Sequence, residues 1–121
     1  MNKWTVLNSL RQLMPLNDKE ADVALPLCST CLEEIRENLK EEANPQDSRI
    51  AAAAAGLAYY KLMVYLLTDE GTVTSFRAGD ITVKQDSKTV IKIAENVRNE
   101  ALMRAAPILK DRDFLFKQVE V

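Results

Sequence analysis

The chain contains two cysteines, Cys28 and Cys31, at the spacing of zinc-binding and redox-active thiol pairs. A tetrahedral zinc site needs four ligands, and the sequence has neither a histidine nor a second cysteine pair. Both thiols also fall on an apolar helical stripe with Ala24 and Ile35. We therefore expect buried core thiols, with a redox pair or a metal shared between subunits as the alternatives.

The remaining residues give little support to a catalytic site or a nucleotide-binding site. Histidine, the commonest general base and metal ligand, is absent. The three glycines lie too far apart for a phosphate-binding loop. Glu33, Glu37 and Glu41 repeat every fourth residue, but carboxylate-bridged metal helices also need Glu-x-x-His pairs. This repeat predicts a solvated acidic face that can also serve as a contact surface, and we expect no catalytic, cofactor-binding or metal-ligating residue.

Length and charge limit the class of protein further. The 121 residues suit one domain, 1–121, with a single hydrophobic core. The 16 basic and 18 acidic residues give a net charge of -2, without the basic excess that binding to a phosphate backbone requires. The N-terminus shows no secretion signal, so we expect an intracellular setting in which the thiols stay reduced.

Helical spacing predicts the elements of the N-terminal half. Apolar residues recur at this spacing in the segment 1–16: Trp4, Leu7, Leu10 and Met14. They predict a short helix over Lys3 to Leu13. Asn17 stands at the N-cap of the next helix, with Glu20 at the position that completes a capping box. Pro26 is expected to kink this helix or to restart it.

A second apolar stripe predicts an amphipathic surface helix from Leu25 to Glu42. After a loop, Asp47 or Ser48 is expected to cap a helix that runs to about Thr68. Its alanine run, 51–55, is followed by Gly56 and would let another helix approach closely. Because this helix is apolar nearly all round, we expect it to be the central element of the fold.

The same helix has the composition of a possible membrane span. Ile50 to Leu67 carries a single charge, Lys61. A central lysine is costly in lipid, and five consecutive alanines are weakly apolar for a bilayer span. We therefore expect a buried helix and no membrane partner.

The last long helix is expected to be capped by Asp86 or Ser87 and to end near Pro107. Its predicted apolar stripe comprises Val90, Ala94, Val97, Ala101, Ala105 and Ile108. A C-terminal tail, 111–121, follows. It is too short for a domain and more hydrophobic than an ordinary solvated end.

Between the last two long helices, Val73 to Val83 has a strand-turn-strand pattern. A turn at Ala78-Gly79 would place Arg77 opposite Asp80, and a shift of one residue would reverse the faces of the hairpin. An isolated hairpin is marginal in water, so it leans either on its own helices or on a neighbouring subunit. The expected fold is mainly α, with three to four helices around a central Ala-rich helix and one small β-hairpin.

Three pieces in this order resemble the small head-tail connector proteins (adaptor or head-completion proteins) of tailed bacteriophages and prophages. The first is the Ala-rich helix from Ala51 to Leu67 with Tyr59-Tyr60, and the second is Ser75-Phe76-Arg77-Ala78-Gly79-Asp80-Ile81-Thr82-Val83. The third is the helix from Lys88 to Leu109 followed by Asp113-Phe114-Leu115-Phe116. These are patterns of residue type rather than a catalytic signature.

The resemblance implies a structural subunit, not an enzyme, located at the head-tail junction of the virion and in the bacterial cytoplasm during assembly. Copies form a ring under the portal protein, extend the channel through which DNA passes without specific binding, and dock the tail-joining protein. The resemblance also implies two interface segments. Their residues are Phe76, Arg77, Ala78, Gly79 and Asp80 near the hairpin tip, and Phe114, Phe116 and Lys117 in the tail.

Two other classes of function stay open on the sequence alone. One is a non-viral bacterial helical adaptor or regulatory subunit that acts by protein-protein interaction. The other, a weaker alternative, is a redox or metal protein that uses Cys28 and Cys31.

Overall fold

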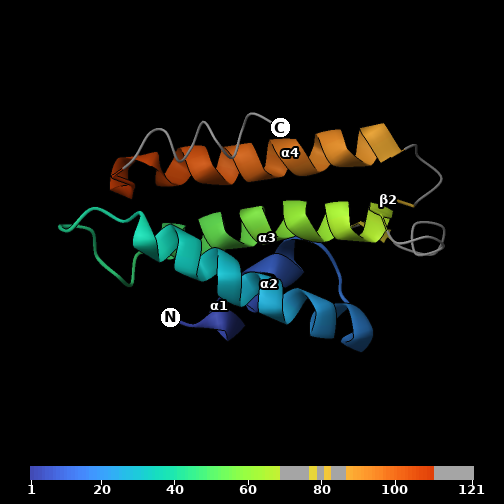
Figure 1. Cartoon of the computed structure of the whole chain (residues 1–121), viewed down its shortest axis with the longest axis horizontal. Helices are drawn as coiled ribbons and strands as arrows, with labels where there is room; N and C mark the ends of the chain where they lie inside the picture. The colour runs from blue at the N-terminus through green and yellow to red at the C-terminus, as the bar shows by residue number, and fades with distance from the viewer. Residues whose placement is uncertain (69–76, 79–80, 83–86, 111–121) are drawn as a thin grey trace.

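The computed structural model describes residues 1–68, 77–78, 81–82 and 87–110, and these residues form a mainly helical fold (Figure 1). The helices are α1 (Lys3–Leu13), α2 (Asp18–Glu37), α3 (Ser48–Thr68) and α4 (Ser87–Ala105), and a 3-10 turn, η1 (Ala106–Ile108), follows α4. Helix α3 packs on α4 on one side and on α1 and α2 on the other. The prediction of a central Ala-rich helix is therefore confirmed.

Helix α1 has the predicted bounds but buries a different set of residues. Asn2 caps it, and Val6, Leu7, Leu10 and Met14 are buried. Trp4 is 55% exposed, so its assignment to the apolar stripe was wrong. At 100° per residue, Trp4 lies about 100° from the centre of the buried stripe, which explains its exposure.

The N-terminus of α2 follows the predicted capping box. The Asn17 side chain accepts a hydrogen bond from the Glu20 main-chain N–H at 2.8 Å, and the Glu20 carboxylate accepts one from the Asn17 N–H at 2.9 Å. Pro26 neither ends nor restarts the helix. Pro26 and Asp22 are both exposed, so water can bind the Asp22 carbonyl that loses its helical partner.

Helix α2 ends at Glu37 and not at Glu42 as the sequence predicts, because the chain turns to pair with the segment after α4. Leu39 forms an antiparallel bridge with Leu109. The N–H of Lys40 donates to the Ile108 carbonyl at 2.9 Å, and the N–H of Lys110 donates to the Asn38 carbonyl at 2.8 Å. This bridge joins the C-terminal ends of α2 and α4.

Asp47 is the residue that caps α3. Its carboxylate accepts a hydrogen bond from the Arg49 main-chain N–H at 2.9 Å and pairs with the Arg49 guanidinium at 2.8 Å. The helix is long and apolar enough to span a membrane by composition, but 67% of the apolar window from Ser48 to Leu67 is buried inside the fold. This is the burial expected of the core helix of a bundle.

Helices α3 and α4 approach closely at Gly56, as the small residues of α3 predict. A Cβ atom built on Gly56 would lie 2.6 Å from the Ala101 Cβ and 3.4 Å from the Val97 carbonyl oxygen. Neither atom can rotate away, because a Cβ and a carbonyl oxygen are fixed to the backbone. Only glycine therefore permits this separation of the two helices.

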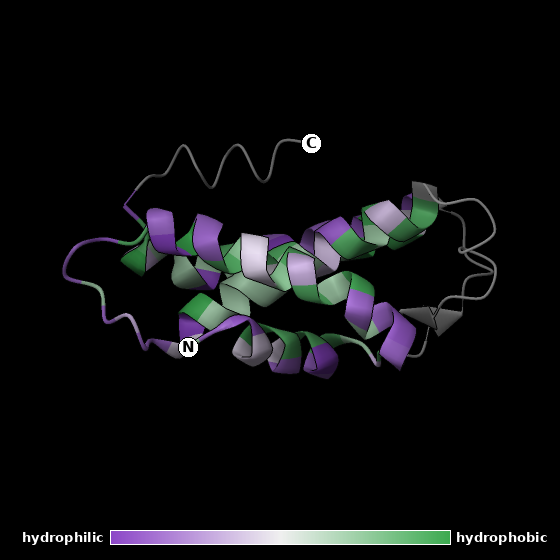
Figure 2. Cartoon of the chain, turned by 60° about the horizontal axis from the view of Figure 1, so that its bottom comes forward, coloured by the Kyte–Doolittle hydropathy of each residue, from purple (hydrophilic) through white to green (hydrophobic). Residues whose placement is uncertain are grey.

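The apolar stripe of α4 is rotated from the prediction. Its buried residues are Val90, Ala94, Arg98, Leu102 and Ala105, followed by Ile108 and Leu109. Val97 and Ala101 are half-buried on the flank of this stripe. The prediction failed because it excluded a charged residue, Arg98, from the core. Figure 2 shows hydrophilic and hydrophobic residues alternating along the helices, as amphipathic packing requires.

Two short segments between α3 and α4, β1 (Arg77–Ala78) and β2 (Ile81–Thr82), pair antiparallel. Arg77 lies opposite Thr82, and Ala78 lies opposite Ile81. The predicted pairing of Arg77 with Asp80 is therefore wrong by two residues along the second segment. The sequence between the paired residues is Gly79-Asp80, which favours a two-residue connection more than Ala78-Gly79 does. The longer hairpin from Val73 to Val83 extends outside the described residues and stays a prediction.

We expect the substitution Gly56→Ala to destabilise the fold. Overpacking typically costs about 1–3 kcal/mol, which exceeds the gain of about 1 kcal/mol from replacing glycine inside a helix. The free energy of unfolding in urea measures the difference. Ala101→Gly in the same chain should recover part of the loss, because it removes the atom at 2.6 Å. Strictly additive effects of the two substitutions would contradict this contact.

We expect the Asp47 cap to make the stability of the protein depend on pH below 4. The side-chain hydrogen bond from Arg49 lowers the pKa of Asp47 to about 2. The stabilisation is therefore present above the ordinary aspartate pKa of about 3.9 and is lost as pH falls towards 2. Thermal melts of the wild type and Asp47→Asn should differ at pH 6 and converge near pH 2. The same pattern in Asp22→Asn would contradict the assignment to Asp47.

Candidate interaction surfaces

Only part of the predicted interface lies in the described structure. Arg77 and Ala78 form β1. The other predicted interface residues lie outside the described residues: Phe76, Gly79, Asp80, Phe114, Phe116 and Lys117. Their roles stay predictions, and the structure places only the backbone of β1 and β2 between α3 and α4.

The strands β1 and β2 pair with each other. Among the described residues, neither strand shares an extensive contact with any of the four helices. Figure 1 shows β2 beside the end of α3, at the opposite end of the bundle from the bridge between Leu39 and Leu109. Two paired residues on each side cannot be stable alone in water, so this segment needs further contacts.

Both thiols of the Cys-x-x-Cys pair are buried in the core on α2. Neither Cys28 nor Cys31 is exposed, and no disulfide joins them. Burial raises the pKa of Cys28 to about 11 and that of Cys31 to about 12. Thiolate, the form that attacks disulfides and binds metals, is therefore scarce at neutral pH. In the part of the chain that the structure describes, no group of acidic residues and cysteines is arranged to hold a metal ion.

Lys61, the single charge in the apolar part of α3, has a specific partner on α2. Its ammonium lies 2.8 Å from the Glu34 carboxylate, and both side chains are about one-third exposed. The charge of Lys61 opposes the rise in the pKa of Cys31, and that of Glu34 adds to it. The position of this pair at the edge of the interface explains how a lysine fits on the central helix.

The predicted acidic repeat does not form one continuous helical face. Glu33 and Glu37 lie on α2, but Glu41 follows the end of the helix at Asn38. The Glu33 carboxylate accepts a hydrogen bond from the Arg36 guanidinium at 3.4 Å on the surface. The repeat is therefore shorter than predicted.

An open groove of about 270 Å³ lies between the start of α1 and the middle of α2. Trp4 lies beside it, with the Lys3 ammonium 5.8 Å from the centre of the indole ring. Arg36 lines the opposite side and donates a hydrogen bond to the main-chain carbonyl of Met1. The groove combines an exposed aromatic ring with charged walls, as surfaces that bind other proteins often do.

Arg98 is the buried residue that sequence reasoning missed. Its guanidinium carbon lies 4.2 Å from the centre of the Tyr60 ring on α3, and its Nε donates to the Asn99 side chain at 3.1 Å. Arg98 has no exposed surface. The helical spacing of the sequence indicates the burial of Arg98, because position 98 follows Ala94 by four residues and precedes Leu102 by four.

Arg98 and Gly56 belong to the same contact between α3 and α4. The Cα atom of Arg98 lies 3.6 Å from the position that a Cβ of residue 56 would occupy, and Tyr60 is one turn further along α3. The Tyr60 ring therefore covers the Arg98 charge beside the close contact of the two helices at Gly56.

Comparison of the chain with protein-family models, curated proteins and solved structures found no match.

We expect the two thiols to react slowly in the folded protein. A thiol with a pKa near 11 has about one-thousandth of its molecules ionised at pH 8, before burial further restricts access. Alkylation by iodoacetamide, followed by mass spectrometry, should be at least about 100-fold slower in buffer than in 8 M urea. Fast labelling of the native protein would support the redox alternative instead.

Proposed function

We propose that this chain is a structural subunit that acts by assembly with other proteins, as a head-tail connector of a tailed bacteriophage or prophage. The resemblance of its three sequence pieces supports the viral role. In the fold these pieces are the Ala-rich helix α3, the segment that contains β1 and β2, and helix α4. The order of the pieces in the resemblance is therefore the order of α3, β1, β2 and α4 in the fold.

The observation that carries the proposal is the short antiparallel pair of β1 and β2 in the segment between α3 and α4. The described pair has two residues on each side, and a hairpin of this length gains stability only from further contacts. A neighbouring subunit or a partner protein can supply both hydrogen bonds and apolar contact to this pair. This favours the reading in which Arg77 and Ala78 meet another component.

The chemistry of the core supports assembly over a redox function. Cys28 and Cys31, the most reactive residues by type, are buried with raised pKa values. Lys61 is engaged by Glu34, and Arg98 is covered by Tyr60. These groups serve packing between helices, so the surface is the part of the molecule left for function.

The proposed partners are the portal protein, the tail-joining protein and further copies of this chain. The net charge of -2 is compatible with a channel through which DNA passes, because an acidic lining does not hold the phosphate backbone. The proposed location is the head-tail junction of the virion, after assembly in the bacterial cytoplasm.

Reconstitution with neighbouring gene products tests the proposal. The chain would be mixed with the portal protein encoded beside it, and complexes would be examined by pull-down and negative-stain electron microscopy. We expect a ring of this subunit on the portal. Binding to no portal protein, together with the absence of capsid and tail genes nearby, would contradict the connector role.

Deletion of residues 114–121 should weaken binding to the portal at least about tenfold, because aromatic side chains such as Phe114 and Phe116 are typical interface anchors. We expect the melting temperature to change by less than about 4 °C, which corresponds to about 1 kcal/mol in a domain of this size. Phe114→Ala with Phe116→Ala should reproduce most of the loss, whereas Gln118→Ala should not. Unchanged binding after the deletion would reject the anchor role of the tail.

The groove beside Trp4 favours the second candidate, a bacterial helical adaptor without a viral role. It lies in the N-terminal part of the chain, outside the pieces that resemble connectors. An adaptor of this kind would capture a partner through Trp4. The substitution Trp4→Ala would then abolish partner binding, but it should leave binding to a portal protein intact if the connector role is correct.

A further inference from the structure

The first turn of α1 presents a tryptophan that the core of the fold does not use. Trp4 is 55% exposed, and it is the single tryptophan of the chain. The Asn2 side chain accepts hydrogen bonds from the main-chain N–H groups of Trp4 and Thr5, at 3.0 and 3.2 Å, which fixes this turn. An aromatic side chain on a fixed turn loses little conformational freedom when a partner covers it.

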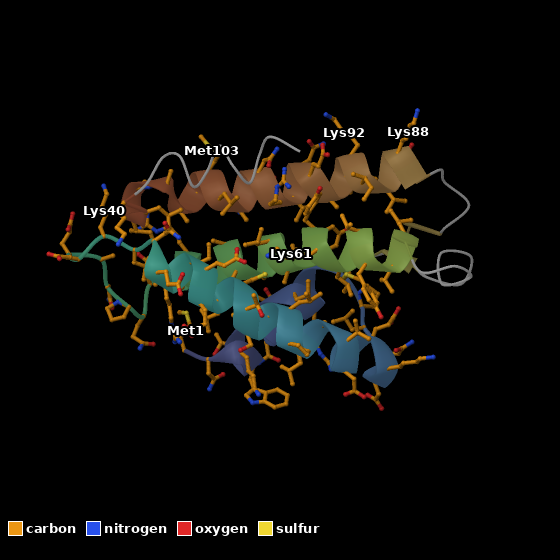
Figure 3. All side chains as sticks on the ribbon, in the orientation of Figure 1. Met1, Lys40, Lys61, Lys88, Lys92 and Met103 are labelled. Atoms are coloured by element: carbon orange, nitrogen blue, oxygen red, sulfur yellow. The ribbon has the colours of Figure 1, made fainter. Side chains whose placement is uncertain are left out.

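Helix α2 supplies the other wall of the groove beside Trp4, and Arg36 is its cation. The Arg36 guanidinium donates a hydrogen bond to the carbonyl of Met1, the residue labelled at the lower left of Figure 3. It donates a second one to the Glu33 carboxylate at 3.4 Å. A guanidinium has five N–H donors, so these two bonds hold it beside the groove and leave other donors for a ligand.

The side chains around the groove offer more hydrogen-bond donors than acceptors. Lys3, Trp4 and Arg36 carry donors and no acceptor. Glu33 is the one carboxylate among the described residues that line the groove, and Arg36 already engages it. Two cations against one anion leave the lining with a net positive charge. This set of groups suits a ligand that brings carboxylate oxygens.

The wall that α1 contributes carries positive charge only. Residues 1–17 contain no acidic side chain, and the first one, Asp18, stands at the start of α2. Lys3 is exposed, and its ammonium lies 5.8 Å from the centre of the Trp4 ring. An apolar surface and a cation therefore lie side by side at the rim of the groove. A peptide with an acidic residue next to an apolar one can contact both at once.

A nucleic acid suits this surface less well than a peptide does. Proteins bind a phosphate backbone through several cations at once, and the whole chain has a net charge of -2. Glu33 and Glu37 are exposed one turn apart on α2 and would repel a continuous row of phosphates. A short acidic segment needs only the local donors of the groove.

We propose that the groove between α1 and α2 binds an acidic peptide segment of a partner protein. Its carboxylates bind Lys3 and Arg36, and its apolar part packs against the indole of Trp4. The inference goes beyond the connector role, because the groove lies outside the three pieces that carry the resemblance. It names the class of partner that the adaptor of the second candidate function would capture. Since the groove is open and its ion pairs are exposed, binding is weak and depends on low salt.

The fluorescence of Trp4 reports directly on occupation of the groove, because no other tryptophan contributes. The full chain would be titrated at low salt with three blocked peptides: Asp-Glu-Leu-Asp-Glu, its amide analogue Asn-Gln-Leu-Asn-Gln, and Lys-Arg-Leu-Lys-Arg. We expect the acidic peptide to shift the emission to shorter wavelengths and to saturate at millimolar concentration. The amide analogue should bind at least about fivefold more weakly, because it lacks the charge-assisted hydrogen bonds. The basic peptide should leave the emission unchanged.

Variants of the lining give opposite changes that a merely structural role would not produce. Lys3→Gln and Arg36→Gln should each weaken binding of the acidic peptide about threefold or more, whereas Glu33→Gln should strengthen it about twofold to fivefold. Arg11→Gln, on the exposed part of α1 outside the lining, is the matched control and should leave the affinity unchanged. Thermal melts confirm that each variant is folded.

Three results would overturn the inference. The first is an unchanged Trp4 emission with the acidic peptide, and the second is equal binding of the acidic peptide and its amide analogue. The third is binding of an oligothymidylate as tight as that of the acidic peptide, which would assign the groove to a nucleic acid. None of these results bears on the portal assay, which does not use the groove. Failure to bind any portal protein, with selective binding of the acidic peptide intact, would contradict the connector role alone.

Discussion

The close contact between α3 and α4 at Gly56 is the constraint on which the rest of the fold depends. It fixes the distance between the two helices to a value that no side chain at position 56 allows. Helix α3 can then bury residues against α4 on one side and against α1 and α2 on the other. The alanines that precede Gly56, from Ala51 to Ala55, have small side chains and are mostly buried. They keep the central helix narrow where the neighbouring helices pack against it.

A thin central helix offers little side-chain volume, and long residues from the neighbouring helices fill the space around it. Arg98 is the largest of these, and its guanidinium stacks over Tyr60 beside the glycine contact. A buried guanidinium is costly unless polar groups and an aromatic face compensate for lost water. Its location also makes the register of α3 and α4 specific, because a shift by one turn would move Arg98 away from Tyr60.

Local signals in the sequence predicted the helix beginnings well. Asn17 with Glu20, and Asp47 before α3, act through hydrogen bonds within a few residues, so their effect does not depend on the rest of the chain. Features set by distant contacts were not predictable in the same way. The end of α2 depends on Leu109, and the burial of Arg98 depends on Tyr60. The interface residues of the tail remain predictions from the resemblance.

The distribution of charge follows the packing of the helices. Charged residues inside the bundle have partners that hold helices together, as Lys61 and Glu34 do. The outer faces of α2 and α4 instead carry exposed charges of both signs, such as Asp18 and Lys19 on α2 and Lys92 and Glu100 on α4. Exposed ion pairs contribute little to stability, so the contacts of Lys61 and Arg98 between helices, rather than these outer charges, hold the helices in register.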